Sequence, residues 1–188
     1  MNYAFLLFLA LSVIACSEAP KSSEKPVYYD VAGYVTGQVK ILSSEKPPVT
    51  KRLQMGQKTE QQTSRAINWS RELELFMQAD INKPALRGSY AIARPDSLTY
   101  RYTLKPTEKN LTVRSLTVKL DSSTRQPLRI EAVLVSENSL YKAEKQILLE
   151  SGPGKGSVWG VTHYRLSGFQ HLSISDKNTF DVEGTISR

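Results

Sequence analysis

The chain has 188 residues, of which 40% are hydrophobic and 23% are charged, with a formal net charge of +7. This composition is typical of a folded globular chain and excludes a disordered, collagen-like or low-complexity one. A single cysteine excludes an internal disulfide, so the fold has to rest on packing. The basic residues are scattered without a Lys/Arg run, which argues against nucleic-acid binding and favours a solvated outer face, with contact to an anionic surface as the alternative.

Residues 1–15 have the features of a secretory leader. Residues 4–15 are uncharged and apolar, but this run is shorter than the roughly 20 residues that a membrane-spanning helix needs. The motif Val13-Ile14-Ala15-Cys16 resembles the lipobox of bacterial lipoproteins. That resemblance implies cleavage before Cys16, a diacylglyceryl group on its thiol, and an acyl chain such as palmitate on the new amine. Several acyl chains anchor a protein stably, whereas one chain binds only marginally.

The residue after Cys16 indicates the membrane to which a bacterial lipoprotein is sorted. Ser17 stands there rather than an acidic residue, and by resemblance to the enterobacterial sorting rule this implies the outer membrane. We therefore predict a lipid-anchored protein of the bacterial cell envelope that faces the periplasm, with the membrane leaflet left open. Residues 16–27 are mostly small and polar, which predicts a lipidated cysteine followed by a flexible tether. Residues 28–188 are then a single domain.

Residues 28–44 fit two patterns. Val31, Val35 and Leu42 fall on one face of a helix that Asp30 would cap. Several apolar residues of the same stretch also alternate as in a strand. The helix is the favoured interpretation, ended by Pro47-Pro48, and the strand remains the alternative.

A hairpin and a second helix are expected next. Residues 49–55 and 58–66 are largely polar and flank Gly56-Gln57, which predicts an exposed hairpin. Residues 69–80 follow Asn68, a favoured cap, and predict a helix. Its expected buried stripe consists of Trp69, Leu73, Phe76 and Met77.

The remainder of the chain predicts an antiparallel meander. Several runs alternate apolar and polar residues, as strands with one buried and one solvated face do, and turn residues separate them. We therefore predict an α+β fold, in which a large curved antiparallel sheet packs on one or two N-terminal helices or curls toward a barrel. The expected strands are 89–93, 98–104, 111–120, 128–135, 140–149, 158–166 and 179–186, with a short piece at 171–174.

The sequence contains no catalytic motif that we recognise. His163 and His171 lack the spacing of a zinc site, and surface or structural roles are favoured for both. Residues 152–157 superficially resemble a phosphate-binding loop but lack its Ser/Thr and its first glycine, which favours a hairpin turn. No GxSxG motif occurs. We predict a non-enzymatic protein without a catalytic residue, metal or cofactor.

Aromatic residues are the most suggestive candidates for a ligand site. Tyr and Trp combine an apolar body with a polar tip, which suits a ligand pocket as well as a plain core, and the core interpretation is favoured. The candidate ligand-facing residues are Trp69, Tyr100, Tyr102, Tyr141, Trp159 and Tyr164.

Two further resemblances concern the envelope. Asp96-Ser97-Leu98 resembles the O-glycosylation site of Bacteroidetes envelope proteins, which makes Ser97 a candidate glycosylation site. Residues 29–34 (YDVAGY) and 68–90, with the segment W-x-R-E-L-E-L-F-M-Q-A-D-I-N-K-P-A, are similar to a group of Bacteroidetes periplasmic lipoproteins of unassigned function. That resemblance supports a helix over 28–44 and implies no activity.

These observations lead to one functional prediction. We predict that the anchored domain binds either a hydrophobic or amphipathic envelope ligand, such as a lipid or glycan, or an envelope protein partner. The alternative is a hydrolase that acts on envelope glycans or lipids, for which converging carboxylates in a cleft would be the sign.

Overall fold

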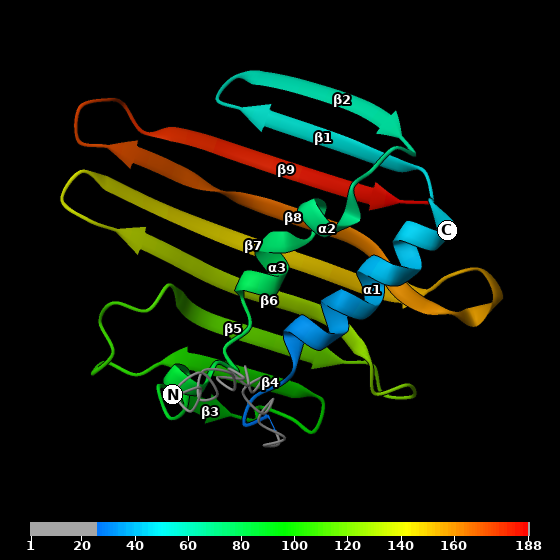
Figure 1. The fold of residues 1–188 in the computed structure, drawn as a ribbon, viewed down its shortest axis with the longest axis horizontal. Helices are drawn as coiled ribbons and strands as arrows, with labels where there is room; N and C mark the ends of the chain where they lie inside the picture. The colour runs from blue at the N-terminus through cyan, green and yellow to red at the C-terminus, as the bar shows by residue number, and fades with distance from the viewer. Residues whose placement is uncertain (1–25, 188) are drawn as a thin grey trace, which may run out of the picture.

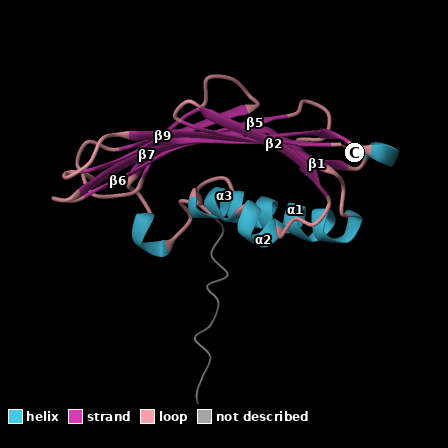
Figure 2. Ribbon diagram, turned by 90° about the horizontal axis from the view of Figure 1, so that it is seen from above, coloured by secondary structure: helices cyan, strands magenta, loops and turns pink. Residues whose placement is uncertain are grey.

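The computed structural model describes residues 26–187, so the predicted leader and the predicted lipidation at Cys16 lie outside the described residues. Nine antiparallel strands form one sheet in the order β2-β1-β9-β8-β7-β6-β5-β4-β3 (Figure 1). The sheet is curved, and the α-helices of this part of the chain lie along one face of it (Figure 2). The predicted α+β architecture is confirmed. The sheet stays open, with β2 and β3 as its edges, and does not close into a barrel.

The helical interpretation of the first segment is confirmed. Helix α1 spans Val31–Glu45, and its N-cap Asp30 accepts a 2.7 Å hydrogen bond from the backbone N–H of Gly33. It ends where Lys46 adopts a left-handed conformation and donates its N–H to the carbonyl of Leu42. A proline pair follows at once and cannot continue the helix. The sequence therefore sets both ends of α1 through local chemistry.

The second predicted helix is interrupted, which corrects the expectation of one helix over 69–80. Helix α2 covers Trp69–Glu72, helix α3 covers Glu74–Gln78, and Leu73 between them has a ψ of 8°. The N–H of Phe76 then bonds the Leu73 carbonyl in a tighter i to i+3 turn. Met77 of the expected buried stripe is 37% exposed, while Ala79 is buried.

The first hairpin is where it was predicted, but it also joins the main sheet. Strand β1 (Val49–Met55) pairs with β2 (Lys58–Ser64) on one side. On its other side β1 pairs with the last strand, β9 (Asn178–Ile186). The hairpin is therefore the outer margin of the sheet and not a detached pair.

The other strands follow one another as a meander. The predicted separate piece at 171–174 is corrected, because residues up to 172 belong to one long strand β8. Two short 3-10 turns, η1 (Pro84–Leu86) and η2 (Lys155–Ser157), lie in the connections. The strands are β3 (Tyr90–Ala93), β4 (Thr99–Leu104), β5 (Val113–Leu120), β6 (Pro127–Glu137), β7 (Tyr141–Pro153) and β8 (Trp159–Leu172).

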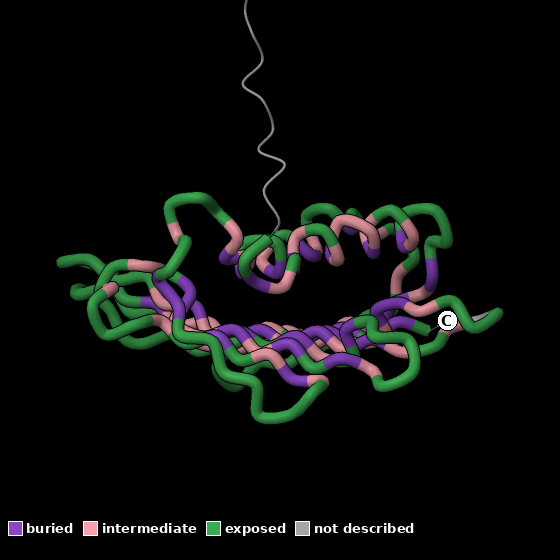
Figure 3. Tube along the Cα trace, turned by 90° about the horizontal axis from the view of Figure 1, so that it is seen from below, coloured by how far each residue is buried: buried purple, intermediate pink, exposed green. Residues whose placement is uncertain are grey.

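The core lies between the helices and the sheet, where Figure 3 shows the buried residues. A β-bulge between Glu150 and Ser151 shifts the register of β7 against β8. Helix α1 supplies polar partners there: the side chain of Gln38, only 4% exposed, accepts a 3.0 Å hydrogen bond from the backbone N–H of Val161. The hydroxyl of Tyr34 donates to the Ser151 hydroxyl at 2.6 Å. Helix α1 thus supplies hydrogen-bond partners at the bulge, in addition to the Thr162 hydroxyl of β8, which donates to the Glu150 carbonyl at 3.4 Å.

Candidate functional site

The predicted ligand-facing aromatic residues do not converge on one cavity. Tyr100 and Tyr102 on β4 belong to a tyrosine cluster with Tyr28, Tyr29 and Tyr90, near the start of the described chain. The Tyr28 and Tyr102 rings meet edge to face, with centroids 5.3 Å apart. The Tyr102 hydroxyl accepts a 2.9 Å hydrogen bond from the Tyr29 backbone N–H. These two candidates therefore fix the start of the domain to the sheet.

The other aromatic candidates are engaged in different places. Trp69, the first residue of α2, and Tyr164 on β8 are both buried, and the Tyr164 hydroxyl donates a hydrogen bond to the Glu72 carboxylate on α2. Trp159 is half-buried and donates its indole N–H to the Pro127 carbonyl at 3.0 Å. Tyr141 is half-buried at the start of β7. Of the six, only Trp69 borders a cleft described below.

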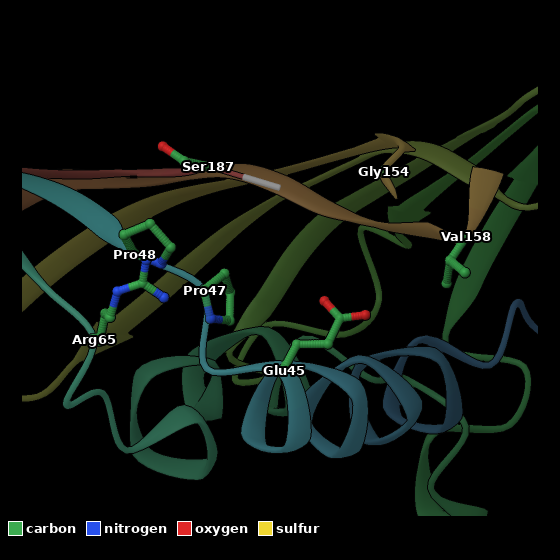
Figure 4. A pocket seen from close by; sticks show the side chains of 7 residues that line it. All are labelled: Glu45, Pro47, Pro48, Arg65, Gly154, Val158 and Ser187. Atoms are coloured by element: carbon green, nitrogen blue, oxygen red, sulfur yellow. The ribbon is translucent and has the colours of Figure 1, made fainter. Parts of the chain in front are cut away.

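A cleft of about 540 Å³ opens where α1 ends against the sheet. We call it the α1 cleft. Figure 4 shows the Glu45 carboxylate pointing away from α1 toward the sheet, with the Arg65 side chain beside Pro48. Its lining comes from the end of α1, the α1–β1, β2–α2 and β7–β8 connections, and the residue that follows β9. The lining residues are Glu45, Pro47, Pro48, Arg65, Gly154, Val158 and Ser187.

The α1 cleft combines apolar walls with charged groups. The two prolines and Val158, which is 46% exposed, present hydrocarbon surface. Arg65 is exposed, and its guanidinium donates a weak hydrogen bond of 3.4 Å to the Lys46 carbonyl. The Arg65 guanidinium, which is held through one Nη N–H and is exposed to solvent, is suited to bind a carboxylate or phosphate.

Arg65 also borders a second cleft. This one has a volume of about 660 Å³ and is lined by residues from the end of α1 to the start of α2. Lys46 contributes a second cation to it, and Ile67 and Trp69 contribute apolar surface. The two clefts therefore share one positively charged border.

The backbone on both sides of the α1 cleft is unusual. Three non-glycine residues have positive φ in residues 26–187, and two of them, Lys46 and Ser157, adjoin this cleft. Gly156, beside Ser157, also has a positive φ of 65°. Non-glycine residues in this conformation cost free energy and concentrate at functional sites. Gly154 and Val158 of the β7–β8 connection line the cleft, and η2 is too short to present a helix N-terminus.

The convex face of the sheet carries a ladder of charges across β6, β7, β8 and β9. His163 lies between two carboxylates, with Nδ1 3.0 Å from Glu150 and Nε2 2.9 Å from Glu183. Arg129 pairs with Glu150 at 2.6 Å, so the ladder continues to β6. These groups satisfy one another across neighbouring strands, which is a structural arrangement. His171 is exposed near the end of β8.

The remaining candidates are placed as follows. Ser97 is exposed in the β3–β4 connection, where Asp96 accepts hydrogen bonds from the Leu98 N–H and the Thr99 hydroxyl. Within the described range, no group of three or more His, Cys, Asp or Glu residues is arranged to hold a metal ion. No helix between residues 26 and 187 is long and apolar enough to cross a membrane.

Comparisons with known proteins add no relative. No family model matches the sequence, and no curated protein or solved structure is significantly similar to it. The candidate site therefore rests on geometry alone.

Sequence reasoning missed the α1 cleft. Its lining residues are spread over segments as distant as Glu45 and Ser187, and each segment looks like an ordinary connection. The one usable signal is the glycine-rich run 152–157, for which the sequence predicts a hairpin turn. The run leads from the end of β7 into η2, and its Gly154 lines the cleft.

Proposed function

We propose that this chain is a lipid-anchored binding protein of the bacterial envelope, which holds an amphipathic ligand with an anionic group in the α1 cleft. The observation that carries the proposal is Arg65 on the border of two clefts with apolar walls. The volume of about 540 Å³ lies within the roughly 300–1,000 Å³ of small-molecule sites.

The apolar and the anionic parts of the ligand would contact different residues of the cleft. Its hydrocarbon part packs on Pro47, Pro48 and Val158, because burial of apolar area is favourable wherever it occurs. Its carboxylate or phosphate pairs with the guanidinium of Arg65. Glu45 on the opposite wall disfavours a second anionic group and so limits the charge of the ligand.

The anchor completes the proposed role. Acylation at Cys16 would hold the domain at the outer membrane, with residues 17–27 as the tether. Ligands of the envelope are then at high local concentration, so that modest affinity suffices for function. Such a protein needs no catalytic group in the cleft.

The test is calorimetric titration of residues 17–188 with octyl phosphate and with octyl glucoside, a neutral amphiphile of equal chain length. We expect octyl phosphate to bind more tightly. Replacement of Arg65 by Gln should weaken octyl phosphate binding by about 10-fold, which corresponds to the loss of one charge-assisted contact. The matched control is Arg71→Gln, because Arg71 is exposed on α2 and lines neither cleft.

Three outcomes of the same titration are informative. Equal binding of both amphiphiles, or an unchanged affinity of Arg65→Gln, would refute the proposed anion site. Release of octanol and inorganic phosphate, monitored by mass spectrometry after the titration, would favour the hydrolase alternative over a binding protein.

A further inference from the structure

The outer edge of the sheet is strand β2, which has no neighbouring strand on its outer side. β2 has seven residues, all paired with β1 in continuous register from Val49↔Ser64 to Met55↔Lys58. It contains no proline and no bulge, which are two of the devices that protect exposed edges in other proteins, and its charged side chains are Lys58 and Glu60. Six of its seven residues are exposed, and Ser64 is half-buried. An edge of this length is a template for another strand.

The backbone groups that point outward can be identified. At the two ends of β1, the N–H of Gly56 donates to the Thr179 carbonyl and the Pro48 carbonyl accepts from the Ser187 N–H. The even-numbered residues of β1 therefore direct their backbone N–H and C=O groups toward β9. In an antiparallel ladder the alternate residues then point the other way, toward β2. Their β2 partners point back toward β1. The residues of β2 with outward-facing N–H and C=O groups are therefore Thr59, Gln61 and Thr63.

The opposite edge differs in two respects. β3 has only four residues. The start of the described chain also packs there, since the Tyr28 ring contacts Tyr90 of β3 and Tyr102 of β4. A tether that reaches the domain at the β3 side leaves the β2 edge, on the far side of the sheet, accessible.

We propose that β2 pairs with β2 of a second copy of this chain, antiparallel and centred on Gln61, so that two nine-stranded sheets become one continuous sheet. In this register Gln61 pairs with the partner's Gln61, and Thr59 pairs with the partner's Thr63. Each of these pairs exchanges two backbone hydrogen bonds. Thr–Thr cross-strand pairs are favourable, and one already forms within the chain, where Thr50 and Thr63 hydroxyls are 3.0 Å apart.

The charges on β2 disfavour one neighbouring register. On the other face of the strand, Glu60 lies opposite the partner's Gln62, and Lys58 lies opposite the partner's Ser64. A shift of two residues toward the hairpin turn would instead place Glu60 opposite the partner's Glu60, which is unfavourable. The sequence of β2 is thus self-complementary about Gln61, as a twofold interface requires.

The first test is sedimentation equilibrium of residues 17–188. The core cluster lies between Tyr28 and Ile186, so this fragment keeps the whole domain. We expect a concentration-dependent monomer–dimer equilibrium. Gln61→Pro removes the central outward N–H without touching the β1 ladder and should abolish the dimer, whereas Gln61→Thr keeps that N–H and should preserve it. A monomer at every concentration, or a dimer that survives Gln61→Pro, would overturn the proposal.

The second test holds even if the proline variant unfolds. Gln61→Cys places two thiols at the twofold axis, with Cα atoms about 5.5 Å apart, within disulfide range. The fragment has no other cysteine. Mild oxidation should crosslink Gln61→Cys much faster than Ser122→Cys, which carries the thiol on the exposed β5–β6 turn. Equal crosslinking rates for the two variants would contradict the predicted pairing.

Discussion

The hydroxyl of Tyr164 on β8 donates a 2.7 Å hydrogen bond to the carboxylate of Glu72 on α2. The same carboxylate pairs with Lys51 on β1, whose ammonium nitrogen is 2.7 Å from it. Burial, followed by the hydrogen bond to Glu72, raises the pKa of the Tyr164 phenol far above its usual value. One glutamate therefore joins a short helix to two strands that are not neighbours in the sheet.

Replacement of Glu72 by Ala should destabilise the domain. It leaves the buried Tyr164 hydroxyl without its acceptor and the half-buried Lys51 without its counter-charge. We expect a loss of about 2 kcal/mol in the free energy of unfolding, measured by urea denaturation. Glu74→Ala is the control, because Glu74 is exposed on the adjacent α3, and its effect should stay within about 0.5 kcal/mol. Equal stabilities of the two variants would show that the link contributes nothing.

Gly184 on β9 is required because the Tyr164 ring lies directly over it. A Cβ at this position would overlap the ring. Gly184→Ala should therefore cost about 2–3 kcal/mol through overpacking. Gly37→Ala in α1 is the opposite case, since a Cβ there meets nothing within 4 Å, and it should stabilise the helix by about 0.5–1 kcal/mol. Thermal melting of both variants should give shifts of opposite sign.

The Gln38 side chain is expected to stabilise the fold by accepting a hydrogen bond from the backbone N–H of Val161. Gln38→Leu preserves the approximate size of the side chain but leaves the buried Val161 N–H without an acceptor. We expect a loss of about 2 kcal/mol and faster hydrogen exchange at the Val161 amide, measured by NMR. Gln78→Leu on the exposed side of α3 should leave both quantities unchanged. Slow exchange at Val161 in Gln38→Leu would mean that another group satisfies this amide.

Deprotonation of the buried Tyr90 hydroxyl should lower the free energy of unfolding in alkali. Burial, followed by the nearby Tyr28, raises its pKa from 10.0 to about 12, while its hydroxyl donates to the Val113 carbonyl at 2.9 Å. The folded state therefore binds more protons than the unfolded state between these pH values. This stabilisation is complete below about pH 10 and is lost as the pH rises through 12. Tyr90→Phe should flatten the decline of unfolding free energy over that range, and an equally steep decline would contradict this assignment.

Local chemistry made much of the fold predictable. The Asp30 cap and the proline pair delimit α1, and the alternation of residues such as Tyr100 and Tyr102 marks the strands, because both signals lie within a few residues of the element they describe. The pairing of β1 with β9 had no such signal, since it joins segments at opposite ends of the domain. The same applies to the ladder around His163, which exists only once three strands are aligned.

The candidate site was less predictable than the fold. Tyr and Trp side chains were chosen for their chemistry, but the hydroxyls of Tyr102 and Tyr164 are used inside the domain. Nothing in the sequence marks Arg65 as part of a binding site, because a single arginine in a polar connection resembles any other surface residue. Its position between two clefts depends on how α1, α2 and the β7–β8 connection pack together.

The side chain of Asn82 forms hydrogen bonds to the backbone at Tyr28 and Tyr29, just after the proposed tether. It accepts from the Tyr28 N–H at 3.0 Å and donates to the carbonyls of Tyr28 and Tyr29 at 3.3 and 3.0 Å. Tension applied through the N-terminal segment would thus load several hydrogen bonds at once before it reached the first turn of α1. If the chain is anchored at Cys16 as proposed, these bonds of Asn82 would bear such a force before α1 does.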